Sequence, residues 1–261
     1  MNYPGDYTAA ELMAIVLARD IPDDSVGEMG AYSEVPMAAC KLARLMHAPS
    51  FQWICSASGM VTPKGPLYHS STDFRNSQGC EGSYNMNDVN IFIMRKVDFF
   101  FAGGIQVDRF GNINLTVIGD YHKPKLRGPG AAALPMISSL PIKYYIYQAR
   151  HDRLTFVEKV DFISAPGYID GPEGRARVGL PSQGGPKLVV TPLGVLDFPP
   201  ETCHMRLKAV HPGVSPEQVQ ENTGFPLDRA PQIEETPAPT TQELHLLHSK
   251  VDPHGILREM G

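Results

Sequence analysis

The chain has 261 residues, of which 42% are hydrophobic and 20% charged, so wholesale disorder is excluded. The net charge of −5 and the lack of a basic cluster argue against a nucleic acid or an anionic membrane as partner. The apolar runs are too short to span a bilayer, and the N-terminal sequence predicts no signal peptide. The four cysteines form no Cys-x-x-Cys pair, so we expect a cytoplasmic protein with reduced thiols.

The first part of the chain is predicted to form two helices and a strand. A capping-box pattern at Thr8 opens a helix over residues 9–19, one face of which is apolar. A Gly-bearing loop is expected over 26–30. A second helix over 35–46 and a short apolar strand over 51–55 follow.

The rest of the chain is predicted to consist mainly of strands joined by loops. Residues 61–90 and 119–135 are rich in small and polar residues and are expected to be mostly loop. One helix opens at Ser215 and another at Thr240, because both positions suit an N-cap. The predicted strands cover residues 98–102, 105–107, 143–148, 156–163, 188–191, 195–198 and 205–210, with one more starting at Ile113.

The 24 glycines and 24 prolines follow no collagen-like period and indicate many tight turns in a compact α/β protein. No repeat or sharp change of composition divides the chain. We therefore predict one α/β domain over residues 1–229. Residues 230–261 are predicted to be a Pro-rich linker followed by a C-terminal helical arm.

A pair of glycines at the end of an apolar strand is the most informative feature. Gly103 and Gly104 allow close approach of a ligand, and their N–H groups suit a carbonyl oxygen on which negative charge develops. Gln106 adds a side-chain amide. The alternative is a plain hairpin in which the glycines provide curvature and Asp108 and Asn112 shape the turn.

Two further segments carry candidate residues. Lys123, Lys125 and Arg127 lie among glycines and prolines and suit phosphate groups, although a solvated basic loop has the same pattern. Cys55 ends an apolar strand, where α/β proteins often place reacting groups, but a small buried cysteine is the commoner state. Two histidines near the C-terminus have no third ligand in view, so we expect no metal site.

Motifs in the same order along nearly the whole chain resemble those of the class I CoA-transferase family, and in particular its β subunits. The matching segments are Gly103–Asp108, Gly111–Asn114, Gly119–Lys125, Ser164–Pro172, Arg177–Pro181, Val190–Leu196, His211–Glu217 and Glu221–Phe225. The resemblance implies an α/β fold with an open, mostly parallel sheet flanked by helices. It also implies an α subunit as partner, in a heterodimer or an α2β2 complex. A coenzyme A thioester is then the substrate, and no covalently bound cofactor is needed.

The resemblance also assigns roles. Gly103 and Gly104, together with Gln106, resemble the oxyanion and thioester site of the family. The candidates for contacts with CoA are Lys123, Lys125, Arg127, Gly128, Gly130 and Ala131.

One departure concerns the glutamate that carries the acyl group and then CoA in the transferases. When the sequences are anchored at Ser58 and Gly59, this glutamate falls at Ala57, whose methyl group forms no acyl anhydride. Cys55 is a candidate substitute, because an extended chain would place it on the same side, roughly 6–7 Å along the strand. Glu81 in the polar loop is the other.

The missing glutamate favours a reaction other than covalent CoA transfer. The segment Gln242–Leu247 resembles the C-terminal arm of relatives in steroid-ring degradation, which hydrolyse a carbon–carbon bond of a cyclic β-keto acyl-CoA. We therefore predict retro-Claisen ring cleavage of a cyclic oxo-acyl-CoA. The alternatives are CoA transfer between a dicarboxylic acyl-CoA and a carboxylic acid through Glu81, decarboxylation through Cys55, and a non-catalytic subunit.

Overall fold

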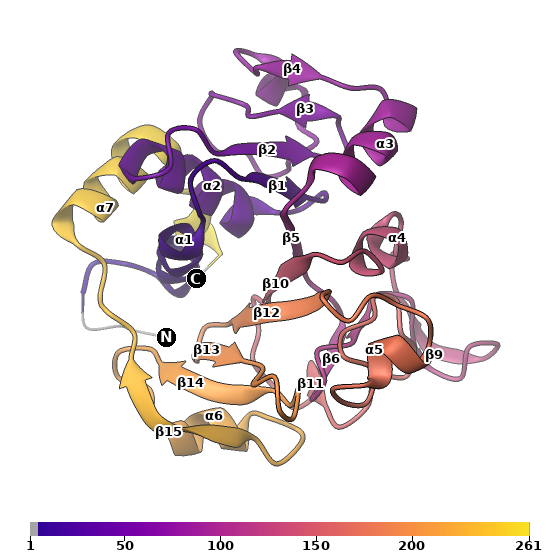
Figure 1. Cartoon of the computed structure of the whole chain (residues 1–261). Helices are drawn as coiled ribbons and strands as arrows, with labels where there is room; N and C mark the ends of the chain where they lie inside the picture. Colours follow the sequence, from indigo (N-terminus) through magenta and orange to yellow (C-terminus); the bar gives the residue numbers. More distant parts are fainter. Residues whose placement is uncertain (1–4, 261) are drawn as a thin grey trace. The chain divides into compact units, whose positions relative to one another are not determined.

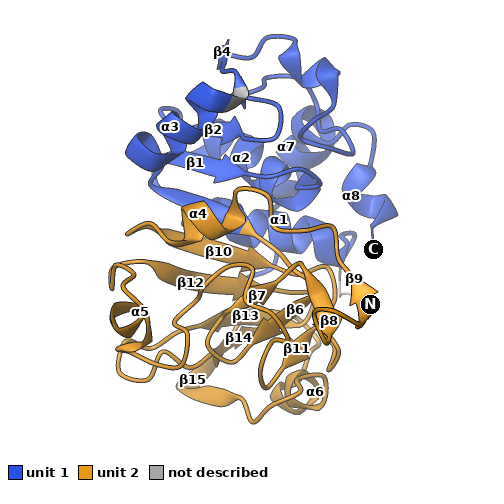
Figure 2. Cartoon of the chain, turned by 90° about the vertical axis from the view of Figure 1, so that its right-hand side faces the viewer, with its two compact units in different colours: residues 1–101, 237–261 blue, residues 102–236 orange. Residues whose placement is uncertain are grey.

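The computed structural model describes residues 5–260 and consists of two compact units. Residues 1–101 and 237–261 make up unit 1, and residues 102–236 make up unit 2 (Figure 2). No helix among the described residues is long and apolar enough to cross a membrane.

Unit 1 contains strands in the order β5-β1-β2-β3-β4 with helices beside them (Figure 1). β5, β1 and β2 are parallel, whereas β3 and β4 are antiparallel additions at the edge. The carboxyl ends of the three parallel strands therefore lie at one edge of the sheet. The elements are α1 (Ala9–Asp20), β1 (Val26–Met29), α2 (Glu34–Met46), β2 (Gln52–Cys55), β3 (Met60–Val61), the short 3-10 helix η1 (Phe74–Ser77), β4 (Gly82–Ser83), α3 (Met86–Lys96), β5 (Phe99–Ala102), α7 (Thr241–Leu246), the π-helical turn η2 (Leu247–Val251) and α8 (Ile256–Glu259).

Helix α1 begins at the capping box that the sequence predicts. The Thr8 hydroxyl accepts a hydrogen bond from the Glu11 N–H at 3.3 Å, and the Glu11 carboxylate accepts one from the Thr8 N–H at 2.7 Å. α1 packs against α2, and both helices bury apolar side chains such as Leu12 and Leu42. Local capping and the buried apolar face together stabilise this helix pair.

The C-terminal arm packs within unit 1, where α7 and α8 contact α2. The buried Glu11 carboxylate lies 2.8 Å from the His248 ring and accepts a hydrogen bond from the Arg258 guanidinium at 3.0 Å. Arg19 and Glu243 form two further hydrogen bonds of 2.7 Å. These charged pairs attach the arm to α1.

Unit 2 contains strands in the order β15-β14-β13-β12-β10 and two small sheets, β11-β6-β7 and β8-β9. β10 is parallel to β12 and β14 to β15, whereas β12, β13 and β14 form antiparallel hairpins. The elements are β6 (Gln106–Asp108), β7 (Ile113–Asn114), β8 (Val117–Gly119), β9 (Pro124–Arg127), α4 (Leu134–Ser138), β10 (Lys143–Tyr147), β11 (Phe156–Val157), α5 (Gly174–Arg177), β12 (Gly185–Val190), β13 (Gly194–Asp197), β14 (Arg206–Val210), α6 (Pro216–Glu221) and β15 (Asp228–Glu235). The predicted α/β class, with an open, mostly parallel sheet flanked by helices, is confirmed.

Two predicted loops of unit 1 contain regular structure. Residues 26–30 include strand β1, which has only four residues and no apolar run to mark it. Residues 61–90 include the start of α3, where the Asn85 side chain accepts hydrogen bonds from the first turn. The prediction was wrong there, because Asn and Gly favour turns as well as helix caps.

Unit 2 also differs from the sequence prediction at three places. Residues 119–135 include strand β9, which pairs with β8 in a hairpin. The predicted strand over 156–163 stops after two residues, because the Asp161 side chain takes over hydrogen bonds of the neighbouring backbone. The first part of the predicted linker over 230–240 is strand β15, which tolerates Pro231 as a strand paired on one side.

Candidate active site

The carboxyl ends of β1 and β2 lie side by side in unit 1. Met29 pairs with Cys55, and the Ser56 N–H then donates to the Met29 carbonyl at 2.9 Å. Residues 56–59 turn the chain from β2 into β3, and Ala57 is exposed in this turn. Active sites of α/β proteins commonly lie at such strand ends.

The chain is not extended after Cys55, contrary to the sequence prediction. The N–H of Gly59 donates to the Cys55 carbonyl at 2.8 Å, which closes a tight turn. Gly59 has a φ of +74°, and a Cβ there would clash with the Tyr84 carbonyl. Cys55 and Ala57 therefore do not face one side of a common strand.

Cys55 is completely buried. Burial raises the pKa of its thiol to about 12, and the nearby Lys41 ammonium offsets only part of this effect. Lys41 itself donates to the carbonyls of Pro63 and Gly65 at 2.7 and 2.8 Å and so holds the loop after β3. The thiol is protonated at neutral pH and is therefore a poor nucleophile.

Glu28 is a buried carboxyl that the sequence did not indicate. It lies in β1, in register with Ile54 and Phe100, and is 5% exposed. Burial raises its pKa to about 7, and a hydrogen bond with the Ser56 side chain acts in the opposite direction. An acid within a buried strand is a strong signal, but the expected loop over 26–30 concealed it.

Glu81 lies at the other end of β2. Its carboxylate accepts hydrogen bonds from Arg44 at 2.6 Å and from Gln52, the first residue of β2, at 3.3 Å. The Lys64 ammonium is 3.7 Å away, and the Arg44 hydrogen bond lowers the pKa of Glu81. The structure does not bring Glu81 to the turn that contains Ala57.

Gly103 and Gly104 precede β6 in unit 2. A Cβ on Gly104 would clash with the Ile113 side chain and lie 2.8 Å from the Asn114 carbonyl oxygen, so packing requires glycine here. A Cβ on Gly103 would lie 3.0 Å from the Tyr147 carbonyl oxygen. Within residues 5–260 we find no hydrogen bond from the N–H of either glycine. These donors are available to a ligand.

Gln106 is buried in a network that connects β6 to its neighbours. Its Nε2 donates to Asp161 at 3.0 Å, and its Oε1 accepts from Asn114 at 2.7 Å and from the Asp161 N–H at 3.1 Å. The same Asp161 carboxylate accepts from the Gly119 N–H at 3.0 Å. Most of the Gln106 amide is therefore engaged within the fold.

Asp108 and Asn112 shape the turn after β6, as predicted. The Asp108 carboxylate accepts from the N–H groups of Phe110 and Asn112 at 3.0 and 3.1 Å and from the Asn112 amide at 2.9 Å. The Asn112 carbonyl oxygen accepts from the Gly167 N–H at 2.8 Å. This turn is a saturated structural network.

Lys123, Lys125 and Arg127 are exposed on the β8–β9 hairpin and its turn. Arg127 donates to the Tyr121 carbonyl at 3.0 Å, and its guanidinium carbon lies 5.0 Å from the centre of the Tyr121 ring. The Tyr121 ring also stacks on Phe162 at 5.6 Å. Cations and flat apolar rings thus share one surface.

Gly128, Gly130 and Ala131 follow this hairpin directly. The N–H groups of Gly128 and Gly130 donate to the carbonyls of Thr116 and Leu115 at 2.9 and 3.0 Å. Gly130 has a φ of +91°, and a Cβ there would meet open space. The backbone of the loop is fixed while its outer side stays open.

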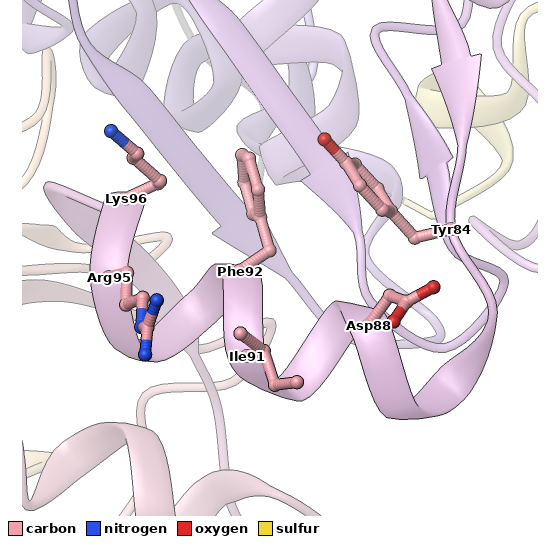
Figure 3. Close-up of a pocket in the computed structure, with 6 residues that line it drawn as sticks. All are labelled: Tyr84, Asp88, Ile91, Phe92, Arg95 and Lys96. Atoms are coloured by element: carbon pink, nitrogen blue, oxygen red, sulfur yellow. The ribbon is translucent and has the colours of Figure 1, made fainter.

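A hollow on α3 lies apart from all of the residues predicted for the site (Figure 3). It is lined by Tyr84, Asp88, Ile91, Phe92, Arg95 and Lys96. Figure 3 shows the Tyr84 and Phe92 rings turned toward each other above the helix. No group of metal-ligating side chains occurs among the residues that the structure describes.

Comparison with known families and proteins places the chain among enzymes of acyl-CoA metabolism. The sequence profile for coenzyme A transferase matches residues 86–222. The β subunit of glutaconate CoA-transferase from Acidaminococcus fermentans is 35% identical over 254 residues, which cover 95% of this chain and 94% of that protein. The β subunit of 3-oxoadipate CoA-transferase from Pseudomonas knackmussii is 34% identical, with 93% of each chain covered. The cholesterol ring-cleaving hydrolase IpdB subunit of Mycobacterium tuberculosis is 33% identical, with 95% and 96% covered.

Two solved structures have the same fold. The crystal structure of glutaconate coenzyme A-transferase from Acidaminococcus fermentans has a TM-score of 0.87 and 33% identity, and the match covers 98% of both chains. The crystal structure of the decarboxylase AibA/AibB has a TM-score of 0.84 and 25% identity, and the match covers 98% of this chain and 99% of that one.

Proposed function

Because the chain belongs to the coenzyme A transferase family, we propose that it is the β-type subunit of a heteromeric enzyme that acts on acyl-CoA thioesters. Curated relatives with this degree of similarity are β subunits, which supports an α subunit as partner, in a heterodimer or an α2β2 complex. Exposed apolar side chains such as Leu126 and Ile163 offer surface for such a partner.

The geometry of unit 2 supports thioester binding without a covalently bound cofactor. The N–H groups of Gly103 and Gly104 have no partner among the described residues and suit an acyl oxygen that gains negative charge. The exposed cations Lys123, Lys125 and Arg127 suit the phosphates of CoA. Gly128, Gly130 and Ala131 border this surface with an open backbone loop.

The favoured reaction is hydrolytic cleavage of a carbon–carbon bond in a cyclic oxo-acyl-CoA. One observation carries this proposal: the β2–β3 turn presents the Ala57 methyl group where the resemblance places the glutamate of the transferases. A methyl group carries neither an acyl group nor CoA, whereas ring cleavage needs only an activated water and stabilisation of the enolate. The similarity to a cholesterol ring-cleaving hydrolase subunit supports the same class.

CoA transfer is the main alternative. Two of the curated relatives are named CoA-transferases, and Glu81 is a carboxylate in the same unit as Ala57. Its ion pair with Arg44 and its position beside Gln52 weigh against a carrier role.

Decarboxylation through Cys55 and a non-catalytic subunit are weaker alternatives. The likeness to the decarboxylase AibA/AibB favours the first, but burial keeps the Cys55 thiol protonated. The substitution Gly103→Val tests the second. It abolishes turnover without dissociating the complex if the subunit takes part in catalysis, and it leaves turnover unchanged if the subunit is only structural.

The proposal is tested by searching for a covalent intermediate in the complex of this chain with its α partner. The complex is incubated with acetyl-CoA and succinyl-CoA, treated with borohydride and analysed by intact mass and peptide mapping. We expect no adduct on this chain while CoA binding is detected. A reduced glutamyl-CoA thioester that maps to Glu81 would contradict the hydrolytic reaction and establish CoA transfer.

A further inference from the structure

The surroundings of Glu28 are unusual for a carboxyl group. Its in-register neighbours on β2 and β5 are the apolar Ile54 and Phe100. Within residues 5–260, no Lys, Arg or His lies within ion-pair distance of Glu28. A buried carboxyl without a cation costs stability, because its charged form is poorly solvated there. A purely structural role would be filled better by an apolar or amide side chain.

Glu28 has one polar side chain beside it, and this side chain leads toward the turn. The Ser56 side chain is its hydrogen-bond partner, and the Ser56 hydroxyl also lies within donor distance, 3.2 Å, of the Met29 carbonyl. Ser56 therefore has two acceptors, one of which is the carboxylate. Ser56 is also half-buried and directly precedes the exposed Ala57, so it connects a buried carboxyl to the open turn.

The electrostatics fit a group that gains and loses protons at neutral pH. Burial raises the pKa of Glu28 to about 7, so both protonation states are populated near neutrality. The titratable group that interacts with Glu28 is Cys55 on the neighbouring strand, whose thiol is neutral in this range. Ser56 can donate to the ionised carboxylate or accept from the protonated one.

We propose that Glu28 is a positioning residue that moves a proton to and from the substrate through the Ser56 hydroxyl at the β2–β3 turn. This inference rests on the proposed function and supplies the base that ring hydrolysis requires. It replaces the role of a carboxylate in the turn by a carboxylate on the adjacent strand, which reaches the turn through one hydroxyl.

The proton balance of the reaction is complete with water as the only co-reactant. The Glu28 carboxylate takes the Ser56 hydroxyl proton while the Ser56 oxygen takes a proton from water. The oxygen of this water bonds to the ring ketone carbon. The bond between that carbon and the α-carbon breaks, and its electron pair moves to the α-carbon as a thioester enolate. The proton returns from Glu28 through Ser56 to the α-carbon and gives a ring-opened carboxylic acid that is still a CoA thioester.

The test compares pH–rate profiles of the complex with its α partner, using 2-oxocyclohexane-1-carboxyl-CoA as the probe. For the unchanged chain we expect kcat to rise with pH through about 7, because the carboxylate must be ionised. Glu28→Gln lowers kcat about 100-fold or more, leaves KM within a few-fold and removes this rise. Ser56→Ala has the same effects. Glu34→Gln is the matched control, because burial also raises the pKa of Glu34; it keeps kcat within twofold and retains the rise.

The outcomes separate this inference from the proposed function. Ring cleavage in which Glu28→Gln keeps both kcat and the pH dependence overturns the role of Glu28 alone. If the complex transfers CoA from succinyl-CoA to acetate instead, the proposed reaction fails, and the same variants are compared in that reaction. Loss of the rise near pH 7 in Glu28→Gln then upholds the inference, and its retention overturns it. A complex that performs neither reaction overturns both.

Discussion

Two buried carboxyls, Asp108 in the β6–β7 turn and Glu28 in strand β1, are alike in burial and differ in their hydrogen-bond partners. Burial raises the pKa of both groups, to about 6 for Asp108 and about 7 for Glu28. Asp108 accepts from two backbone N–H groups and the Asn112 amide, whereas Glu28 has the Ser56 side chain alone. A saturated carboxylate stabilises a turn, while an unsaturated one costs stability and is available for chemistry.

The polar groups inside unit 2 are expected to be structural throughout, and its two buried histidines provide the largest effect. Burial lowers the pKa of His151 and His211 from 6.5 to about 4. The unfolded chain therefore binds more protons between these values, and stability falls as pH falls from 6.5 to 4. We expect each histidine to remove about 3 kcal/mol over this window, measured by urea unfolding. A chain as stable at pH 4.5 as at pH 7 would contradict this.

Removing the saturated carboxylate should come next in size. Asp108→Ala leaves the N–H groups of Phe110 and Asn112 and one amide N–H buried without this acceptor. We expect a loss of about 3 kcal/mol at pH 7, from urea unfolding curves with unchanged slope. A loss below about 1 kcal/mol would show that the turn is not held by this network, and the comparison with Glu28 would fail.

Removing the unsaturated carboxylate should have the opposite sign. The folded chain binds more protons at Glu28 than the unfolded chain between pH 4.5 and about 7, so stability decreases as pH rises through this window. Glu28→Gln removes that loss and should stabilise the chain by about 2 kcal/mol at pH 8, with little change at pH 4.5. Unfolding at both values measures it. Destabilisation at pH 8 would mean that the ionised carboxylate has stabilising partners.

The cationic hairpin of unit 2 should affect binding rather than stability. Arg127 is exposed, so Arg127→Ala should raise KM for an acyl-CoA about tenfold while kcat stays within twofold. Arg177→Ala removes another exposed arginine, which pairs with Asp170, and is the matched control. Equal KM values for the two variants would exclude Arg127 from the CoA contact.

The smallest effect is expected at Glu81. The ion pair between Glu81 and Arg44 lies near the surface, so Glu81→Gln should change stability by less than about 1 kcal/mol. It should leave ring cleavage unchanged, as followed by product formation at neutral pH. Complete loss of activity in this variant would favour a covalent carrier and hence CoA transfer.

The sequence predicted the parts of the fold that local patterns specify. The capping box at Thr8 marks the start of α1, and the apolar run after Pro49 marks β2. Strand β1 escaped prediction because four residues with a central Gly-Glu pair lack an apolar run. Helix α3 escaped because Asn85 begins it within a polar, loop-like segment.

The same limits explain which site residues the sequence could supply. Gly103 and Gly104 were found because a glycine pair after an apolar strand is a local signal. Glu28 could not be found in this way, because its importance arises from burial against Ile54 and Phe100, which are distant in the chain. Gln106 was assigned to the substrate because its bonds to Asp161 are equally long-range.

The central claim is that water, and not a carboxylate of this chain, attacks the acyl-CoA. It is tested most directly by incubating the complex with 2-oxocyclohexane-1-carboxyl-CoA in ¹⁸O-labelled water and analysing products and protein by mass spectrometry. The account predicts a ring-opened dicarboxylic acyl-CoA with one ¹⁸O in its free carboxyl group and an unmodified chain. An intact ring together with CoA bound covalently to a glutamate of this chain would contradict it.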